Sequence, residues 1–497
     1  MNPRTPSHPS GSSEERLPEP GYRSSAPPAT KVTLARSLGL LAAVSIILGN
    51  VVGTGVFLKA RVMTCNVGSP GLVLGAWVVA GLLSLAGALT YAELAALWPR
   101  AGGEYVFVRE AYGPGAGFLY GWMQIFIAKT GSQASIAAAF AIFLNDVTGG
   151  ALGRSTFPID LFGHSLSLGA MQLAPLVLIA LTTLLNCAAV VVSGWAATAL
   201  TAVKLALVLG IGFGAFWFVD GGWGNFAASG AGGTCEGVDP AARSGVAGFG
   251  AAVLGALWGY DGWNNLTLIA GEIKDPQRNV PRALVGGTLA VLVLFVFVNA
   301  SYFYVLDPTA IASVSTSSSV AREVSLRFLG PGAVGLIAAG LVASSVGTLH
   351  TSVLTGARIP YAMARDGLLF QSLARLAPRT RVPVRALALQ GAWASLLALS
   401  GSFDALTDYV LFGSWIFYAL VTASVFLFRK RLPHAERPYR AWGYPVVPAL
   451  FLIASALLLA NTVLTASRQA LIGLALIAAG LPVYYAVFRN RRVIDWE

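Results

Sequence analysis

Two ionisable residues stand inside long apolar stretches and are the first candidates for chemistry. Lys204 lies near the middle of one stretch, and Asp261 lies in another. A charged side chain at the centre of a bilayer costs about 2.5–3.5 kcal/mol on insertion scales, so such residues are usually functional. Lys204 stands far from the predicted end of its span for a snorkelling side chain, which favours a function. Asp261 could receive a basic substrate or a proton, or cap a half-helix, and we favour the cap.

Glycine-rich sequences interrupt two of the apolar stretches. The first is Gly-Asn-Val-Val-Gly-Thr-Gly-Val-Phe at Gly49–Phe57, and the second is Leu-Trp-Gly-Tyr-Asp-Gly-Trp-Asn-Asn at Leu257–Asn265. The first alone permits two interpretations. It is a transmembrane helix broken at mid-depth, with its second half starting near Gly53, or a site of close helix packing through small residues. The second sequence favours the break, because paired glycine-interrupted spans, each leading a group of five, indicate a transporter with inverted repeats.

A helix broken within a membrane offers groups of both signs to a ligand. The free amides of Gly53, Thr54 and Gly55 can take a carboxylate, and the carbonyls near Val51 can take an ammonium. The second break, near Trp258 to Asp261, would add carbonyls for the ammonium. A zwitterionic amino acid carries both charges at this spacing. Trp258 could close over such a ligand, or it could be a packing tryptophan.

Five other residues indicate a function less clearly. Lys129, which Thr-Gly-Ser follows, fits a structural pairing equally well, and His350 fits a satisfied packing residue better than a proton site. The cysteines Cys65, Cys187 and Cys235 are too few and too scattered for a disulfide framework or a metal site. We therefore expect no metal, no cofactor and no catalytic residue.

The composition limits the classes of protein. The chain has 497 residues, of which 56% are hydrophobic and 11% charged, against about 25% charged in soluble domains. The apolar stretches are continuous and not alternating, which excludes a β-barrel and predicts an all-α polytopic membrane protein. A channel should show a polar stripe along several spans, a receptor an output domain, and a membrane enzyme clustered His, Asp or Glu. None of these is evident.

Twelve apolar spans set the predicted topology. Of the 33 Lys and Arg, 24 fall in one set of loops and the tails, 7 in the other loops and two within spans. This bias predicts that both termini are cytoplasmic. Residues 1–30 are rich in Pro and Ser, which predicts a disordered cytoplasmic tail, and 491–497 form a cytoplasmic C-terminus. The predicted spans are residues 38–59, 71–97, 116–144, 170–192, 196–219, 246–270, 283–306, 332–357, 384–400, 405–428, 445–466 and 470–488.

Several motifs resemble those of the amino acid–polyamine–organocation superfamily, and more closely those of a bacterial member of the L-type amino acid transporter family. The similarity covers about residues 31–490. The matching stretches are Gly53–Phe57, Tyr91–Leu94 with Pro99–Tyr105, Tyr260–Asn264, Glu272 with Pro276–Pro281, and Ala364–Gly367. Together these motifs are specific, although each alone would be weak.

The resemblance implies a transporter domain over residues 31–490. Its ten core helices would form two inverted five-helix repeats, at about 36–219 and 246–428, with helices 1 and 6 broken and two peripheral helices at about 445–488. The implied activity is Na⁺-independent exchange of neutral L-amino acids by alternating access in the bacterial inner membrane. Proton-coupled uptake of cationic amino acids or polyamines is the alternative.

The resemblance also assigns roles to single residues. The substrate backbone would contact Val51, Gly53, Thr54, Gly55, Trp258, Gly259 and Asp261. Trp258 matches a gating aromatic, Asn264 a link between the broken helices, and Tyr302 a gate on the cytoplasmic side. Lys204 matches a fifth-span lysine that replaces the Na⁺ of sodium-coupled relatives, with Ser344 and Ser345 as its partners.

Three departures from the family pattern matter. The mammalian members have a cysteine in the second external loop that links to a single-span partner, and loop 145–169 here has none. We therefore expect no disulfide-linked heavy-chain partner. Asp261 is often glycine in the mammalian members, and His350 also departs, so the substrate class stays undecided.

Overall fold

The structure is a computed structural model that describes residues 36–489 except 155, 162–163, 189, 317, 331–333, 401–402 and 466. The predicted tails at 1–30 and 491–497 lie outside the described residues. All described residues belong to one compact unit, Leu34–Glu497.

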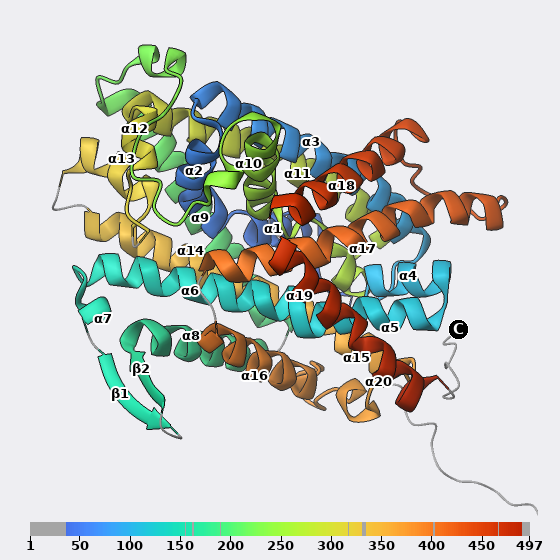
Figure 1. The fold of residues 1–497 in the computed structure, drawn as a ribbon. Helices are drawn as coiled ribbons and strands as arrows, with labels where there is room; N and C mark the ends of the chain where they lie inside the picture. Colours follow the sequence, from blue (N-terminus) through green and yellow to red (C-terminus); the bar gives the residue numbers. More distant parts are fainter. Residues whose placement is uncertain are drawn as a thin grey trace, which may run out of the picture. The chain divides into compact units, whose positions relative to one another are not determined.

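Helices dominate the described chain (Figure 1). The first half contains α1 (Leu40–Val51), α2 (Thr54–Val67), α3 (Pro70–Leu97), α4 (Glu104–Tyr112), α5 (Pro114–Met123), the π-helix η1 (Gln124–Ala128), α6 (Lys129–Val147), α7 (Ala151–Arg154), β1 (Thr156–Leu161), β2 (His164–Gly169), α8 (Ala170–Asn186) and α9 (Val190–Phe218). The second half contains η2 (Trp223–Ala227), η3 (Pro240–Ala242), α10 (Gly245–Tyr260), the 3₁₀ helix η4 (Trp263–Glu272), α11 (Pro276–Val305), α12 (Pro308–Ala312), α13 (Val320–Leu329), α14 (Val334–Gly356), α15 (Arg358–Arg365), η6 (Gln371–Ala374), α16 (Val384–Ser400), α17 (Phe403–Arg431), α18 (Val446–Thr465), α19 (Ser467–Ala478), α20 (Gly480–Val483) and the π-helix η7 (Tyr484–Phe488).

The described residues contain nine helical segments that are long and apolar enough to cross a membrane. These segments coincide with nine of the predicted spans. Two further predicted spans, 170–192 and 384–400, correspond to the shorter apolar helices Ala170–Asn186 and Val384–Leu399. The last, 246–270, is divided between α10 and η4. The protein is therefore a multi-pass membrane protein, and the number of twelve spans stays a prediction.

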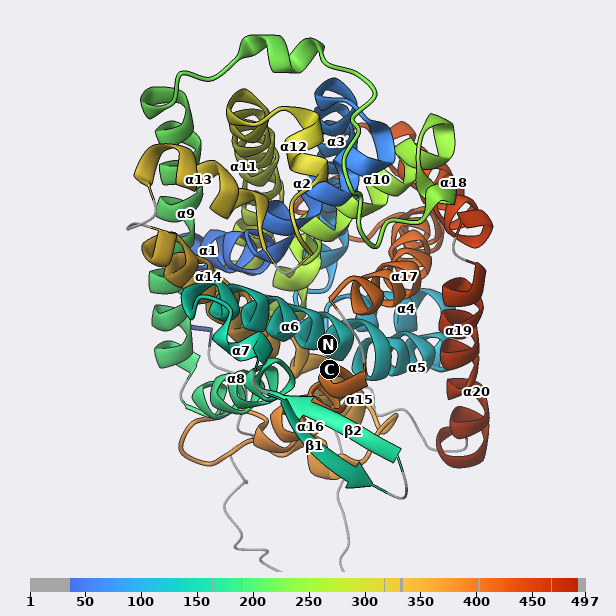
Figure 2. The same cartoon turned by 60° about the vertical axis from the view of Figure 1, so that its left-hand side comes forward.

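The helices pack in pairs across the two halves of the chain. The most extensive contacts join α3 to α11, α6 to α14 and α2 to α10 (Figures 1 and 2). In the order of the predicted spans, these are the second with the seventh, the third with the eighth and the first with the sixth. The two members of each pair have the same number within their predicted repeats. This agrees with the inverted repeats, which stay a prediction.

Both glycine-rich sequences break their helices. α1 ends at Val51, because Val52 and Gly53 are extended (Gly53 φ −151°, ψ −145°), and α2 starts at Thr54, as the sequence predicted. α10 ends at Tyr260, Asp261 is extended, and Gly262 has a φ of +101°, a left-handed conformation that favours glycine. The chain then continues as η4. Each break therefore leaves backbone groups without helical partners.

The described chain is helical as predicted, and the loop at 145–169 adds one short hairpin. Here β1 and β2 pair as an antiparallel hairpin, with Thr156 opposite Gly169. Figure 2 shows the hairpin beside α7 and α8. The physical reason is the alternation of polar and apolar residues in Ser165–Leu168, a period of two that is typical of a strand.

A disulfide contradicts the sequence analysis. Cys65, near the end of α2, is bonded to Cys235. The 170-residue separation hid this pair, because the segment after α9 folds back over the end of α2. The Arg61 guanidinium donates to the Glu236 carbonyl at 2.7 Å and the Ser244 amide to the Asn66 carbonyl at 2.7 Å. Because disulfides persist in oxidising compartments, the bond supports the predicted external position of this end.

Candidate functional site

A small cavity lies between the two helix breaks. Its volume is about 20 Å³, enough for one water molecule but too small for an amino acid. Nine of its ten lining residues are buried, and only Asp261 is partly exposed. The lining comes from the α1–α2 break, the end of α10, α6 and α14, and consists of Asn50, Val51, Gly53, Thr54, Gly55, Ser132, Ile136, Trp258, Asp261 and Thr348.

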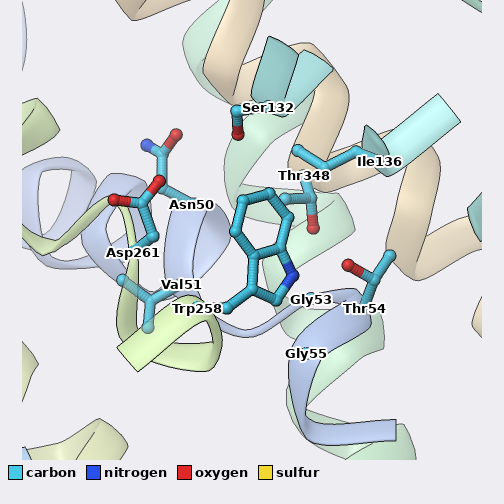
Figure 3. Close-up of a pocket in the computed structure, with 10 residues that line it drawn as sticks. All are labelled: Asn50, Val51, Gly53, Thr54, Gly55, Ser132, Ile136, Trp258, Asp261 and Thr348. Atoms are coloured by element: carbon cyan, nitrogen blue, oxygen red, sulfur yellow. The ribbon is translucent and has the colours of Figure 1, made fainter. Parts of the chain in front are cut away.

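The indole of Trp258 takes up the middle of this site. Figure 3 shows its ring among the lining side chains, with Asn50 and Asp261 on one side and Thr54 and Thr348 on the other. Only 5% of Trp258 is exposed. A ligand larger than water therefore fits only when this indole moves.

The glycines of the first break serve packing as well as lining the cavity. A Cβ atom at Gly53 would lie 2.7 Å from the Thr348 hydroxyl oxygen. A Cβ at Gly55 would lie 2.6 Å from the Cα of Gly259, so the backbones of the two broken helices touch there. Both interpretations of the first glycine-rich sequence are therefore correct. The sequence breaks a helix, and it also allows close packing.

Lys204, on α9, joins the first break to α14. Its buried ammonium donates to the Gly49 carbonyl at 2.6 Å and to the Thr348 hydroxyl at 2.6 Å. The Gly49 carbonyl needs such a donor, because α1 ends before Gly53 could donate to it. The Thr348 hydroxyl in turn donates to the Ser344 carbonyl at 3.0 Å.

The predicted hydroxyl partners of Lys204 were therefore wrong. The hydroxyl that accepts from Lys204 belongs to Thr348. Ser345 donates within its own helix to the Leu341 carbonyl at 3.0 Å, and Ser344 contributes only a backbone carbonyl, through Thr348. Thr348 lies one turn beyond Ser344, and the sequence alone does not set the rotation of α14 about its axis to within one turn.

A second lysine leads into a chain of amides between the breaks. Lys129, at the start of α6, donates to Asn265 Oδ1, and the side-chain nitrogen of Asn265 donates to Asn50 Oδ1 at 3.1 Å. Asn50 donates onward to the Ile46 carbonyl at 2.8 Å. Asn265 therefore links the two broken helices. The prediction of Asn264 for this link was wrong by one position.

Asn264 instead faces α4. Its amide donates to Glu104 Oε1 at 2.6 Å, and Glu104 also accepts from the hydroxyl of Tyr120. Consecutive residues of a 3₁₀ helix point about 120° apart, so neighbours contact different helices. The sequence placed an asparagine at this break but could not choose between two adjacent ones.

Asp261 faces the cavity and is paired inside the protein. Its carboxylate accepts from the Tyr418 hydroxyl of α17 at 2.8 Å. It also attracts the ammonium of Lys129 electrostatically. The capping residue of η4 is Gly262, and its amide is hydrogen-bonded to the Asp261 carboxylate, so the expected role of Asp261 at this helix end stays a prediction. The acid is thus part of a polar group around the site.

Comparisons with known proteins agree with this architecture. The model of the amino acid permease family matches residues 38–488. The chain belongs to this family. It is 29% identical to the serine/threonine exchanger SteT of Bacillus subtilis, over 92% of this chain and 98% of SteT. It is 28% identical to the human b(0,+)-type amino acid transporter 1 (96% and 92% covered), and 29% identical to the rabbit large neutral amino acids transporter small subunit 2 (96% and 84% covered).

A buried ion pair joins η4 to α15 at the predicted cytoplasmic end of the permease. Arg358 donates to the two carboxylate oxygens of Glu272 at 2.8 and 3.1 Å, and both residues are at most 1% exposed. The Glu272 carbonyl accepts from the Ser37 and Leu38 amides, which tie the start of α1 to the end of η4. These contacts at one end and the Cys65–Cys235 disulfide at the other hold both broken helices in place on either side of the cavity.

Tyr302 is not placed to gate that cytoplasmic end. It lies three residues before the end of α11 at Val305, whereas α11 starts at Pro276 on the predicted cytoplasmic side. A helix of 30 residues is about 45 Å long, so its two ends lie on opposite sides of a membrane. Under the predicted topology the fully buried Tyr302 lies toward the external side, so its role as a cytoplasmic gate stays a prediction that this topology does not support.

Some lining residues were missed by the sequence analysis, and His350 lies outside the lining. Ser132 and Ile136 line the cavity one turn apart on α6, and Thr348 faces them from α14. In the sequence, only the i, i+4 spacing of Ser132 and Ile136 could have indicated a shared helix face. The same spacing occurs in every apolar helix of this chain, so it does not single out lining residues. His350 is buried, and its Nδ1 lies 3.0 Å from Asn186 Nδ2, which fits the packing interpretation.

Proposed function

We propose that this permease is a Na⁺-independent exchanger of neutral L-amino acids that works by alternating access. The observation that carries the proposal is the position of Lys204. Its ammonium sits between the Gly49 carbonyl and the Thr348 hydroxyl, whose buried oxygens both accept from it. A protein-borne positive charge at this position takes the place of a bound cation between the first and eighth spans.

The breaks supply the groups for a zwitterion. The amides of Gly53, Thr54 and Gly55 bind the substrate carboxylate, and the carbonyls of Val51, Trp258 and Gly259 bind its ammonium, next to Asp261. Support comes from the cavity, whose lining includes Val51, Gly53, Thr54, Gly55, Trp258 and Asp261. The positive end of α2 favours the carboxylate there. Trp258 moves aside to admit the substrate and closes over it.

The charges around the cavity favour neutral substrates. Asp261 is the acid of the lining, and it already has Tyr418 and Lys129 as partners. A basic side chain would have to compete with Lys129 for this carboxylate. The names of two relatives, a serine/threonine exchanger and a large neutral amino acids transporter, agree with this preference.

Proton-coupled uptake of cationic amino acids is the second candidate. It is favoured by one observation, the position of Asp261 in the cavity wall. In that case the substrate's cationic group would displace Lys129 from the acid. The two candidates differ in substrate and in driving force, so one assay separates them.

The assay uses the purified chain in liposomes loaded with one unlabelled amino acid. Labelled serine, leucine and arginine are offered outside, with Na⁺ or choline, and with or without a pH gradient. We expect uptake of a neutral amino acid that requires a loaded amino acid and ignores Na⁺. Uptake of arginine driven by a pH gradient into empty liposomes would instead establish the second candidate.

The same assay tests the expected absence of a heavy-chain partner. Loop 145–169 carries no cysteine for a disulfide link, so the chain should transport by itself. We also propose a bacterial inner-membrane location with both termini cytoplasmic. Labelling of single introduced cysteines at residues 8 and 494 in intact cells tests this orientation, since both should be protected from an impermeant maleimide.

A further inference from the structure

A large groove lies at the predicted cytoplasmic start of α11 and shares no lining residue with the substrate cavity. Its volume is about 620 Å³, within the range of small-molecule sites. One wall is the first turns of α11, and the other is the segment between α17 and α18. The lining consists of Gln277, Arg278, Pro281, Arg282, Val285, Gly286, Pro438 and Tyr439.

Two arginines give the groove its charge. Arg278 and Arg282 are exposed and stand one helical turn apart on α11. Neither guanidinium has an ion pair or a hydrogen bond to any residue that the structure describes. By contrast, Arg109, Arg358 and Arg429 are all paired with carboxylates. The groove therefore offers two free planar donors, which suit a phosphate, beside the positive end of a helix.

The second wall is built rigidly by a buried acid. Glu93, at the end of α3, accepts hydrogen bonds from Arg429 at 2.7 and 3.0 Å and from the Ala441 amide at 2.7 Å, and it forms an ion pair with Arg437 at 3.2 Å. These bonds hold the chain on both sides of Pro438 and Tyr439. Glu93 belongs to one of the motifs singled out in the sequence, and its carboxylate shapes this groove.

The groove continues into an apolar stripe that faces outward. Above Arg282 on the same face of α11 come Val285 and Gly286, then Leu289 (48% exposed) and Val293 (61% exposed). Eleven residues of helix rise about 16 Å, which matches half of the roughly 30 Å hydrocarbon core of a bilayer. A charged end and an apolar stripe of one leaflet's depth fit a molecule with a phosphate and acyl chains.

We propose that this groove binds an anionic phospholipid. The phosphate sits between Arg278 and Arg282, and an acyl chain follows Val285, Gly286, Leu289 and Val293. The two unpaired positive charges favour a lipid with net negative charge over a zwitterionic one. This site is separate from the substrate cavity, so the inference does not depend on the proposed transport activity.

Native mass spectrometry of the purified protein tests the proposal. The protein is titrated with phosphatidylglycerol, with phosphatidylcholine of the same chains, and with inorganic phosphate. Arg278→Gln with Arg282→Gln is compared with Arg379→Gln plus Arg385→Gln, which removes the same charge from exposed arginines elsewhere on the predicted cytoplasmic side. We expect the groove variant alone to lose about thirtyfold in phosphatidylglycerol affinity.

A third variant tests the acyl chain without changing charge. Gly286→Phe places a ring where a Cβ meets no atom within 4 Å, so the groove is filled without a clash. It should weaken phosphatidylglycerol binding although both arginines remain. Equal phosphatidylglycerol binding by the wild type and the arginine groove variant would overturn the proposal. Displacement of the lipid by inorganic phosphate would show that the groove is a phosphate site, and this result would also overturn the proposal.

Discussion

Removal of the Lys204 ammonium tests the centre of the proposed mechanism. Lys204→Met keeps most of the side-chain volume but leaves the buried Gly49 carbonyl and the Thr348 hydroxyl without their donor, which now lies 2.6 Å from each. A buried acceptor without a partner costs about 1–3 kcal/mol. The first break would then be held in its observed shape less often, and part of the binding energy of a substrate would be used to restore that shape.

A cost of about 2 kcal/mol corresponds to a roughly thirtyfold weaker apparent affinity. The measurement is exchange rate against external substrate concentration in liposomes, with Na⁺ or choline. Thr348→Val, which removes one of the two acceptors, should show a smaller loss in the same direction. Ser345→Ala is the matched control, because that hydroxyl bonds within its own helix, and its affinity should match the wild type.

Three results would refute this reasoning. An unchanged apparent affinity in Lys204→Met would show that the ammonium does not hold the break. A loss in Ser345→Ala as large as in Thr348→Val would show that any change on α14 has the same effect. Wild-type exchange that requires Na⁺ would show that the lysine does not replace a cation.

Three further predictions concern the cavity. Trp258→Ala should slow turnover more than it weakens affinity, because the indole closes the site; a loss of affinity at unchanged turnover, measured by counterflow, would make it a pocket wall. Lys129→Met should admit arginine, since Asp261 loses its positive neighbour, and competition of labelled serine by arginine measures this; continued exclusion of arginine would contradict the charge argument. Gly55→Val should lower the yield of monodisperse protein in size-exclusion chromatography, because a Cβ there lies 2.6 Å from the Gly259 backbone. A yield of the variant equal to that of the wild type would show that the two helices can separate.

The sequence predicted the breaks and the buried lysine because both depend on local chemistry. Glycines at Gly53 and Gly262 permit extended and left-handed backbone within an apolar span, and a lysine in such a span is costly wherever it points. Nine predicted spans match helices for the same reason, since hydropathy over about 20 residues does not depend on tertiary contacts.

The errors in the predicted residue pairings concern the rotation of an element or a contact distant in sequence. Asn265 in place of Asn264, and Thr348 in place of Ser344, are shifts of one position and one turn that depend on how η4 and α14 are rotated against their neighbours. The Cys65–Cys235 bond depends on the path of the segment after α9. Neither rotation nor path is fixed by a local pattern, because both are set by packing against helices from the other half of the chain.

The fixed charge of Lys204 has a consequence for how transport is driven. A bound Na⁺ can leave when the site opens to the cytoplasm, so its gradient does work in each cycle. An ammonium that belongs to the chain stays in place, held by the Gly49 carbonyl and Thr348. It can stabilise the first break, but it cannot bring energy from an ion gradient. Under the proposed function, which uses neither Na⁺ nor a pH gradient, the energy comes from the gradient of a second amino acid, and a fixed charge in place of Na⁺ fits such an exchanger.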